Sequence, residues 1–178
     1  MKKATIVLLV LGCFVMLQAC AGTPKLPESK AGLYANQELS FTVEYPENYA
    51  PQPLQGDEVF RAANPNPYLV PVLTVSAVDA SADAKLESAP FLEAAEAAIP
   101  GSKRFKILSE ESVTLNDGTP GLAMAYKWTF SDGMTKLQTA SLWILKDGKS
   151  ISANATTILG GDTTPEMLLE MVKTLKFY

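Results

Sequence analysis

The chain has 178 residues, a formal net charge of −4 and no histidine. This acidic balance argues against a nucleic-acid partner, because neutralising phosphates requires a basic face. The absence of histidine excludes a Ser-His-Asp triad, an imidazole base and a histidine ligand for zinc, copper or iron. We therefore expect neither an enzyme nor a metal or cofactor site. The chemistry left open is that of Ser-Lys pairs, carboxylate pairs and hard cations held by oxygen.

The first 20 residues have the pattern of an export signal that ends at a lipid-attachment site. Two lysines precede an apolar run over residues 4–17, which is too short for a membrane span. The run ends in Leu17-Gln18-Ala19-Cys20, which resembles the bacterial lipobox. In such proteins the peptidase cuts before the cysteine, whose sulfur carries the lipid. We predict a lipoprotein signal peptide over residues 1–19 and lipid attachment at Cys20; the alternative is an ordinary cysteine near the end of a plain signal.

The predicted mature chain would contact a membrane through acyl chains on Cys20. Cys13 would leave with the signal, so the remaining single cysteine could form no internal disulfide. Ala21, rather than Asp, follows the cysteine, and by analogy with enterobacterial sorting this favours an outer membrane, with the protein facing the periplasm. Residues 20–33 are rich in Gly, Pro, Ser and Lys and predict a flexible tether. Residues 34–178 predict one globular domain.

The first half of the domain combines strand patterns with one helical pattern. Period-two alternation over residues 40–45 predicts a half-buried strand that ends at Pro46. Further strands are predicted over residues 58–62 and 68–78, where Pro71 indicates a sheet edge or bulge. Between residues 88 and 99 the apolar spacing becomes helical, and Pro-Gly follows it.

The second half predicts a meander of strands followed by a closing helix. Three Asp-Gly pairs, each a strong hairpin signal, divide residues 104–158 into about four strands. The bulky face of one strand, residues 122–130, is expected to meet a helix layer. A helix is predicted to start at Thr163 or Thr164, just before Pro165. The fold class is therefore α+β, with an antiparallel sheet of about six to seven strands and helices packed on it.

Several motifs together carry a resemblance to a known family. They are Phe41-x-Val43-x-Tyr45-Pro46 followed by Tyr49, Gly118-x-Pro120-Gly121 in a hairpin, the last strand around residues 151–155, and the mid-chain and final helices. This pattern, over residues 33–178, resembles PsbP-like and Mog-like domains, to which bacterial lipoproteins of the DcrB type are similar. The resemblance implies an α/β/α sandwich with a non-enzymatic accessory or binding role. Tyr49 stands where the family is expected to have tryptophan.

Two acidic motifs are weighed as a cation site and as a catalytic carboxylate pair. Asp79-x-Ser81-x-Asp83 with Glu87 has the opening of a calcium loop, but Ala84 and Pro90 occupy the places that need glycine and a bidentate glutamate. We interpret it as a solvated connector. Glu110-Glu111 would point to opposite faces of a strand, so surface charge is expected rather than a catalytic pair.

Aromatic residues supply the remaining candidates. Tyr126, Trp128, Phe130 and Trp143 could line a small-ligand cavity, but their strand spacing favours core packing. Tyr45, Tyr49 and Tyr68 lie in or beside proline-rich loops, where exposed aromatics favour recognition of a partner.

We therefore expect a lipid-anchored bacterial envelope protein with a non-catalytic binding or assembly domain and an envelope protein as its partner. The alternatives are a periplasmic carrier of small apolar ligands and, less favoured, a weak hydrolase.

Overall fold

The computed structural model describes residues 26–65 and 71–178. The strands before the first described helix are β1 (Leu33–Asn36), β2 (Phe41–Glu44), β3 (Ala50–Pro51), β4 (Glu58–Ala63) and β5 (Val72–Asp79). Helix α2 (Ser88–Ala98) follows, and then β6 (Lys103–Thr114), β7 (Pro120–Thr129), β8 (Lys136–Lys146) and β9 (Lys149–Ile158). The chain closes with helix α3 (Pro165–Val172) and strand β10 (Lys176–Phe177).

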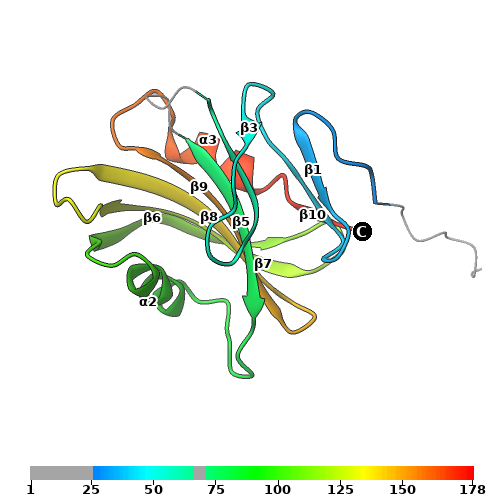
Figure 1. Cartoon of the computed structure of the whole chain (residues 1–178). Coiled ribbons are helices and arrows are strands. Elements are labelled where there is room, and N and C mark those ends of the chain that lie inside the picture. Colours follow the sequence, from blue (N-terminus) through cyan, green and yellow to red (C-terminus); the bar gives the residue numbers. More distant parts are fainter. Residues whose placement is uncertain (1–25, 66–70) are drawn as a thin grey trace, which may run out of the picture.

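The described strands form two sheets (Figure 1). The larger has seven strands in the order β3-β4-β5-β9-β8-β7-β6, and every neighbouring pair in it is antiparallel. The smaller has three, in the order β1-β2-β10. The predicted α+β class and the predicted number of strands in the main sheet are confirmed. The strand predicted over residues 40–45 belongs to the smaller sheet instead.

Asp-Gly turns build the meander from β6 to β9, as predicted. Asp147 and Gly148 alone connect β8 to β9, with φ values of 50° and 73°. Positive φ at both central residues is the geometry of the tight hairpin turn whose twist matches that of the strands. In the preceding turn, the Asp132 carboxylate accepts hydrogen bonds from the backbone N–H groups of Met134 and Thr135, both at 2.8 Å. The side chain thus holds the longer turn closed.

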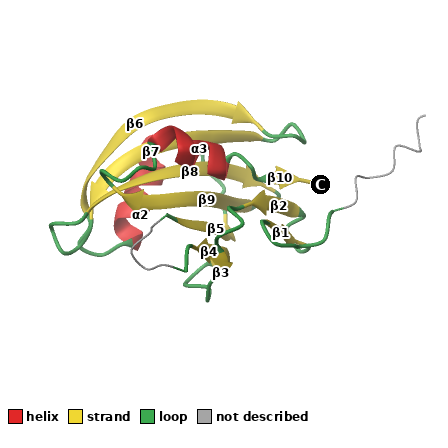
Figure 2. Cartoon of the chain, turned by 90° about the horizontal axis from the view of Figure 1, so that it is seen from above, coloured by secondary structure: helices red, strands yellow, loops and turns green. Residues whose placement is uncertain are grey.

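The main sheet is covered on both faces (Figure 2). Helix α3 and the smaller sheet lie on one face, where α3 packs against β7, β8 and β9. Helix α2 lies over the other face, where Phe91, Leu92 and Ile99 pack against side chains of β7 and β8. This arrangement is the helix-sheet-helix sandwich that the resemblance implied, with the smaller sheet added to one layer.

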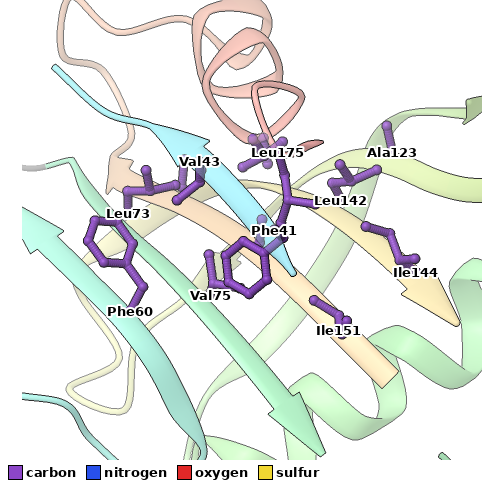
Figure 3. Packing of buried hydrophobic residues seen from close by; sticks show 14 of the residues in the cluster. Phe41, Val43, Phe60, Leu73, Val75, Ala123, Leu142, Ile144, Ile151 and Leu175 are labelled. Atoms are coloured by element: carbon purple, nitrogen blue, oxygen red, sulfur yellow. The ribbon is translucent and has the colours of Figure 1, made fainter. Parts of the chain in front are cut away.

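The larger apolar core lies between the two sheets and α3 (Figure 3). Phe41 and Val43 of β2 are fully buried and face Leu73 and Val75 of β5, with Leu175 beside them. The β-branched and aromatic side chains of β2 therefore join the smaller sheet to the larger one. Burial of each such side chain stabilises the fold by roughly 1.5–3 kcal/mol.

The bulky face of β7 forms a second cluster, beneath α2. Tyr126, Trp128 and Trp143 are buried there, and the ring of Phe105 stacks on Trp128 with 5.6 Å between centroids. The predictions that this face is core and that it meets a helix are confirmed for these residues. Phe130, at the end of the same stripe, is 41% exposed, because β7 has already ended at Thr129.

Three short strands and one boundary differ from the prediction. Strands β1, β3 and β10 were not predicted. The interval assigned to a flexible tether already contains fixed backbone: Lys30 and Leu33 exchange two backbone hydrogen bonds of 2.9 Å, and the Ala35 N–H donates to Ser29 Oγ at 2.8 Å. Strand β5 is an interior strand rather than an edge, and it starts just after Pro71, where no ladder N–H is needed.

Among residues 26–65 and 71–178, no helix combines the length and the apolar character that crossing a membrane requires.

Candidate functional site

Two neighbouring grooves lie where the chain enters the domain, beside β1, and Lys30, Leu33 and Tyr45 line both. We call the first the methionine groove. It has a volume of about 670 Å³ and lies between β1, the end of β2 and α3. Its chief side chains are those of Leu33, Glu44, Glu47, Met167, Glu170 and Met171.

We call the second the leucine groove. It has a volume of about 530 Å³ and runs from β1 towards the loop between β3 and β4. Its chief side chains are those of Tyr34, Tyr45, Pro51, Leu54, Val59 and Phe60. Leu54 is 56% exposed, so this groove presents apolar surface to solvent.

The turn that precedes β1 lines the methionine groove. Gly32 has a φ of 76°, and its carbonyl accepts a hydrogen bond of 2.9 Å from the Tyr45 N–H. A Cβ atom at Gly32 would lie 3.3 Å from the Tyr45 carbonyl oxygen. Both the left-handed backbone and this close approach favour glycine. Gly32 therefore lets the incoming chain lie directly against the end of β2.

Thr174 fixes the other wall of the methionine groove. Its hydroxyl oxygen accepts a 3.1 Å hydrogen bond from the Glu44 N–H and lies 3.1 Å from the Glu44 carbonyl oxygen and 2.8 Å from that of Met171. One side chain thus ties the end of α3 to the end of β2. At the other end of α3, Thr164 caps the helix by accepting from the Met167 N–H, and Pro165 occupies the first turn.

Tyr34 and Tyr45 line one side of the leucine groove. The Tyr34 hydroxyl donates to the Val59 carbonyl oxygen at 2.9 Å, and the Tyr34 ring stacks on Phe60 with centroids 4.4 Å apart. The Tyr45 ring packs against Phe60 from 5.3 Å and remains half-buried. Of the predicted recognition tyrosines, Tyr45 therefore lies in the candidate site, on the boundary between the two grooves.

Tyr49 does not have the exposure that we expected of it. It is 9% exposed and belongs to the larger core, and burial raises its pKa to about 12. The loop folds inward here because the Tyr49 N–H donates to the Pro46 carbonyl oxygen at 2.8 Å. Tyr49 is therefore a packing residue. Tyr68 and Cys20 lie outside the described residues, and their predicted roles stay predictions.

The aromatic residues considered for a ligand cavity line neither groove. Tyr126, Trp128 and Trp143 pack against Phe91 and Phe105 beneath α2, on the other face of the sheet. Their surfaces are in contact with one another and with the helix. The aromatic side chains that the carrier hypothesis would use to bind a ligand are therefore in contact with other side chains of the protein.

The acidic motif before α2 does not assemble a cation site. Asp79 forms an exposed ion pair of 2.7 Å with Lys149, and the hydrogen bond and the positive charge of that lysine lower the pKa of the carboxyl. Within the described part of the chain, no group of three or more acidic or cysteine side chains is arranged to hold a metal ion. Glu111 pairs with Lys173, the residue that follows α3, whereas Glu110 lies opposite Met124, which faces α2. The two glutamates therefore point to opposite faces, as predicted.

Sequence reasoning missed the grooves themselves, and the signals for them were weak. Met167, which is 56% exposed, and Met171 line the methionine groove from α3, but the sequence pattern of this helix did not single them out. The remaining walls come from β1, which was not predicted. One usable signal was Gly32, whose place just before a short apolar segment indicated a turn.

Comparison with solved structures identifies the fold. The solution structure of a cyanobacterial PsbP protein, CyanoP from Synechocystis sp. PCC 6803, matches with a TM-score of 0.62 and 15% sequence identity, covering 89% of this chain and 99% of that one. A crystal structure from Bacteroides thetaiotaomicron VPI-5482 matches with a TM-score of 0.52 and 15% identity, covering 84% of this chain and 49% of that one. No family model and no curated protein sequence matches. The resemblance to DcrB-type lipoproteins stays a prediction, and the finding is that this chain has a PsbP-like fold.

Proposed function

We propose that this chain is a lipid-anchored bacterial envelope protein whose PsbP-like domain is a non-catalytic binding or assembly module. The observation that carries the proposal is the pair of grooves that share Lys30, Leu33 and Tyr45. Both are open to solvent, which suits a segment of another protein better than an enclosed small molecule. A PsbP-like fold is consistent with such an accessory role.

The proposed anchor determines where the grooves would act. They lie beside the segment through which the chain enters the domain, so an acyl group on Cys20 would keep them within a short length of chain from the membrane surface. The proposed location is the outer membrane, facing the periplasm, on the basis of Ala21. The proposed partner is a second envelope protein held near the same surface.

Labelling and fractionation of cells that express the full chain test the anchor. Labelled palmitate is expected to enter the protein and to be lost in Cys20→Ser, which then moves from the membrane to the soluble fraction. Cys13→Ser is the matched control, because it removes the other cysteine of the chain and should leave both properties unchanged. Membrane retention and labelling of Cys20→Ser would overturn lipid attachment at this residue.

Site-specific photocrosslinking in intact cells tests the binding surface. A photoreactive residue at Leu54 or Met167, each 56% exposed, is expected to give one discrete adduct with an envelope protein. The same residue at Met134, which is 82% exposed in the turn between β7 and β8, is the control. The proposal predicts no such adduct there. Equal adducts at all three positions, or none at the grooves, would overturn it.

A further inference from the structure

We propose that the methionine groove binds a cationic amphipathic segment of the partner protein, an inference that rests on the binding function proposed above. The apolar part of the groove comes from Leu33, Met167 and Met171, with Tyr45 at its boundary. Methionine side chains are unbranched and polarizable, so they adapt to apolar partners of different shapes. Met167 is more than half exposed and is available for such contact.

The charged lining of the groove is unbalanced. Three carboxylates, those of Glu44, Glu47 and Glu170, line it together with one ammonium group, that of Lys30. All four residues are exposed. The groove therefore combines apolar side chains with three exposed carboxylates, which we call its negative rim.

Nearby lysines neutralise this rim only in part. Lys173 forms its close ion pair with Glu111, and its Nζ is 4.0 Å from Glu170. Lys176 is 3.7 Å from Glu44, and both side chains are half exposed or more. Among the described residues, Glu47 takes part in no ion pair. Exposed pairs of this kind contribute little, so the carboxylates remain able to bind an incoming cation.

The complement of an apolar surface with a negative rim is a segment with one apolar face flanked by Lys or Arg. The apolar face would supply affinity by burying the methionines. The flanking cations would supply orientation and faster association. The same rim disfavours an anionic lipid surface, which would bring like charges together. The partner chemistry that fits is therefore a basic amphipathic protein segment.

Peptide binding to the purified full chain tests this directly. The probe is a fluorescently labelled amphipathic peptide of Leu and Lys, and its controls are peptides with the same Leu pattern in which Gln or Glu replaces Lys. We expect binding in the order Lys, Gln, Glu, with the difference between Lys and Gln reduced at high salt. Equal binding of the Lys and Gln peptides, or no binding of either, would overturn the inference.

Two matched triple variants locate the effect. Glu44→Gln/Glu47→Gln/Glu170→Gln should weaken binding of the Lys peptide about tenfold at low salt, as three exposed ion pairs would. Glu93→Gln/Glu96→Gln/Glu110→Gln removes three exposed charges from α2 and β6 and should change nothing. Met167→Ala should weaken the Lys and Gln peptides alike. Equal effects of the two triple variants would overturn the placement in this groove.

The outcome distinguishes this inference from the function on which it rests. Crosslinks at Met167 in cells without preference for the Lys peptide would refute the cationic segment and leave the binding module standing. Preference for the Lys peptide without any crosslink would refute the envelope partner instead. Displacement of the Lys peptide from the Cys20→Ser chain by anionic vesicles that do not themselves bind the peptide would contradict the exclusion of lipid and overturn the inference.

Discussion

The indole N–H of Trp128 donates a hydrogen bond of 3.0 Å to the Thr139 hydroxyl, across the β7–β8 pair. The same hydroxyl is 2.9 Å from that of Thr156 on β9. One polar chain therefore links three neighbouring strands inside the sheet. Trp128 is buried against Phe105, so its indole N–H needs a hydrogen-bond acceptor inside the protein. The Thr139 hydroxyl is that acceptor.

Replacing Trp128 should reveal how much this contact and its packing contribute. Trp128→Ala should lower the free energy of unfolding by roughly 3–5 kcal/mol, through lost burial and a cavity. Trp128→Phe keeps the aromatic stacking and should cost less. Thr139→Val, which leaves the indole N–H without its partner, should cost about 1–3 kcal/mol. Chemical denaturation monitored by far-UV circular dichroism measures all three. A loss below about 1 kcal/mol for Trp128→Ala would contradict a core role.

The second prediction concerns the pH dependence of stability and rests on the turn between β6 and β7. Partial burial acts to raise the pKa of Asp117, but hydrogen bonds from Lys146 and Thr119, with the charge of Lys146, lower it to about 2. The Lys146 Nζ lies 2.7 Å from the carboxylate, and both side chains are about three-quarters buried. A carboxyl whose pKa falls on folding adds stability above its unfolded pKa.

The contribution should therefore be complete near neutral pH and disappear as pH falls from about 4 to 2. Asp117→Asn keeps the size of the side chain and should lower the free energy of unfolding at pH 7 by about 1 kcal/mol, because solvent screens a pair that remains partly exposed. Near pH 2 the variant and the parent should differ little. A double-mutant cycle with Lys146→Met assigns the effect to this pair. A difference that persists unchanged at pH 2 would contradict the assignment.

The third prediction concerns the C-terminal strand. The Asn116 side chain accepts a hydrogen bond of 3.0 Å from the Phe177 N–H and donates one of 2.7 Å to its carbonyl oxygen. Asn116→Ala should therefore cost about 1–3 kcal/mol. Asn116→Asp keeps the acceptor for the Phe177 N–H but places a carboxylate oxygen against the Phe177 carbonyl oxygen, so it should destabilise the protein as well. Hydrogen exchange at the Phe177 amide should accelerate in the alanine variant before exchange in β8 changes. Unchanged protection of that amide would show that other contacts hold β10.

Elements with local signals were predictable from the sequence. The hairpin from β8 to β9 needs only Asp147-Gly148, whose preference for positive φ is a property of those two residues. Helix α3 carries its own start signal in Thr164 and Pro165. In these cases propensity and tertiary structure favour the same conformation.

Elements held by distant partners were not predictable. Strand β1 has four residues, and the Tyr34 hydroxyl bonds to Val59 on another sheet; β10 has two residues and depends on Asn116. Burial of Tyr49 likewise depends on how its proline-rich loop folds back on the core. The grooves also depend on contacts between segments that are distant in the sequence, because they form where β1 meets α3 and β4. No local pattern encodes that meeting.

The pairing of β5 with β9 has a consequence for the order of folding. It joins Asp79 to Lys149 across the whole segment that forms α2, β6, β7 and β8. We call this pairing the seam of the main sheet. On one side of it the strands form local hairpins, and on the other they form a meander, so within the described seven-stranded sheet the seam is the pairing that brings distant parts of the chain together. Closing it is entropically unfavourable until many contacts form together. Formation of the seam should therefore set the folding rate. Val75→Ala in β5 is expected to slow refolding. A substitution in the β8–β9 turn that slowed refolding equally would indicate a different folding nucleus.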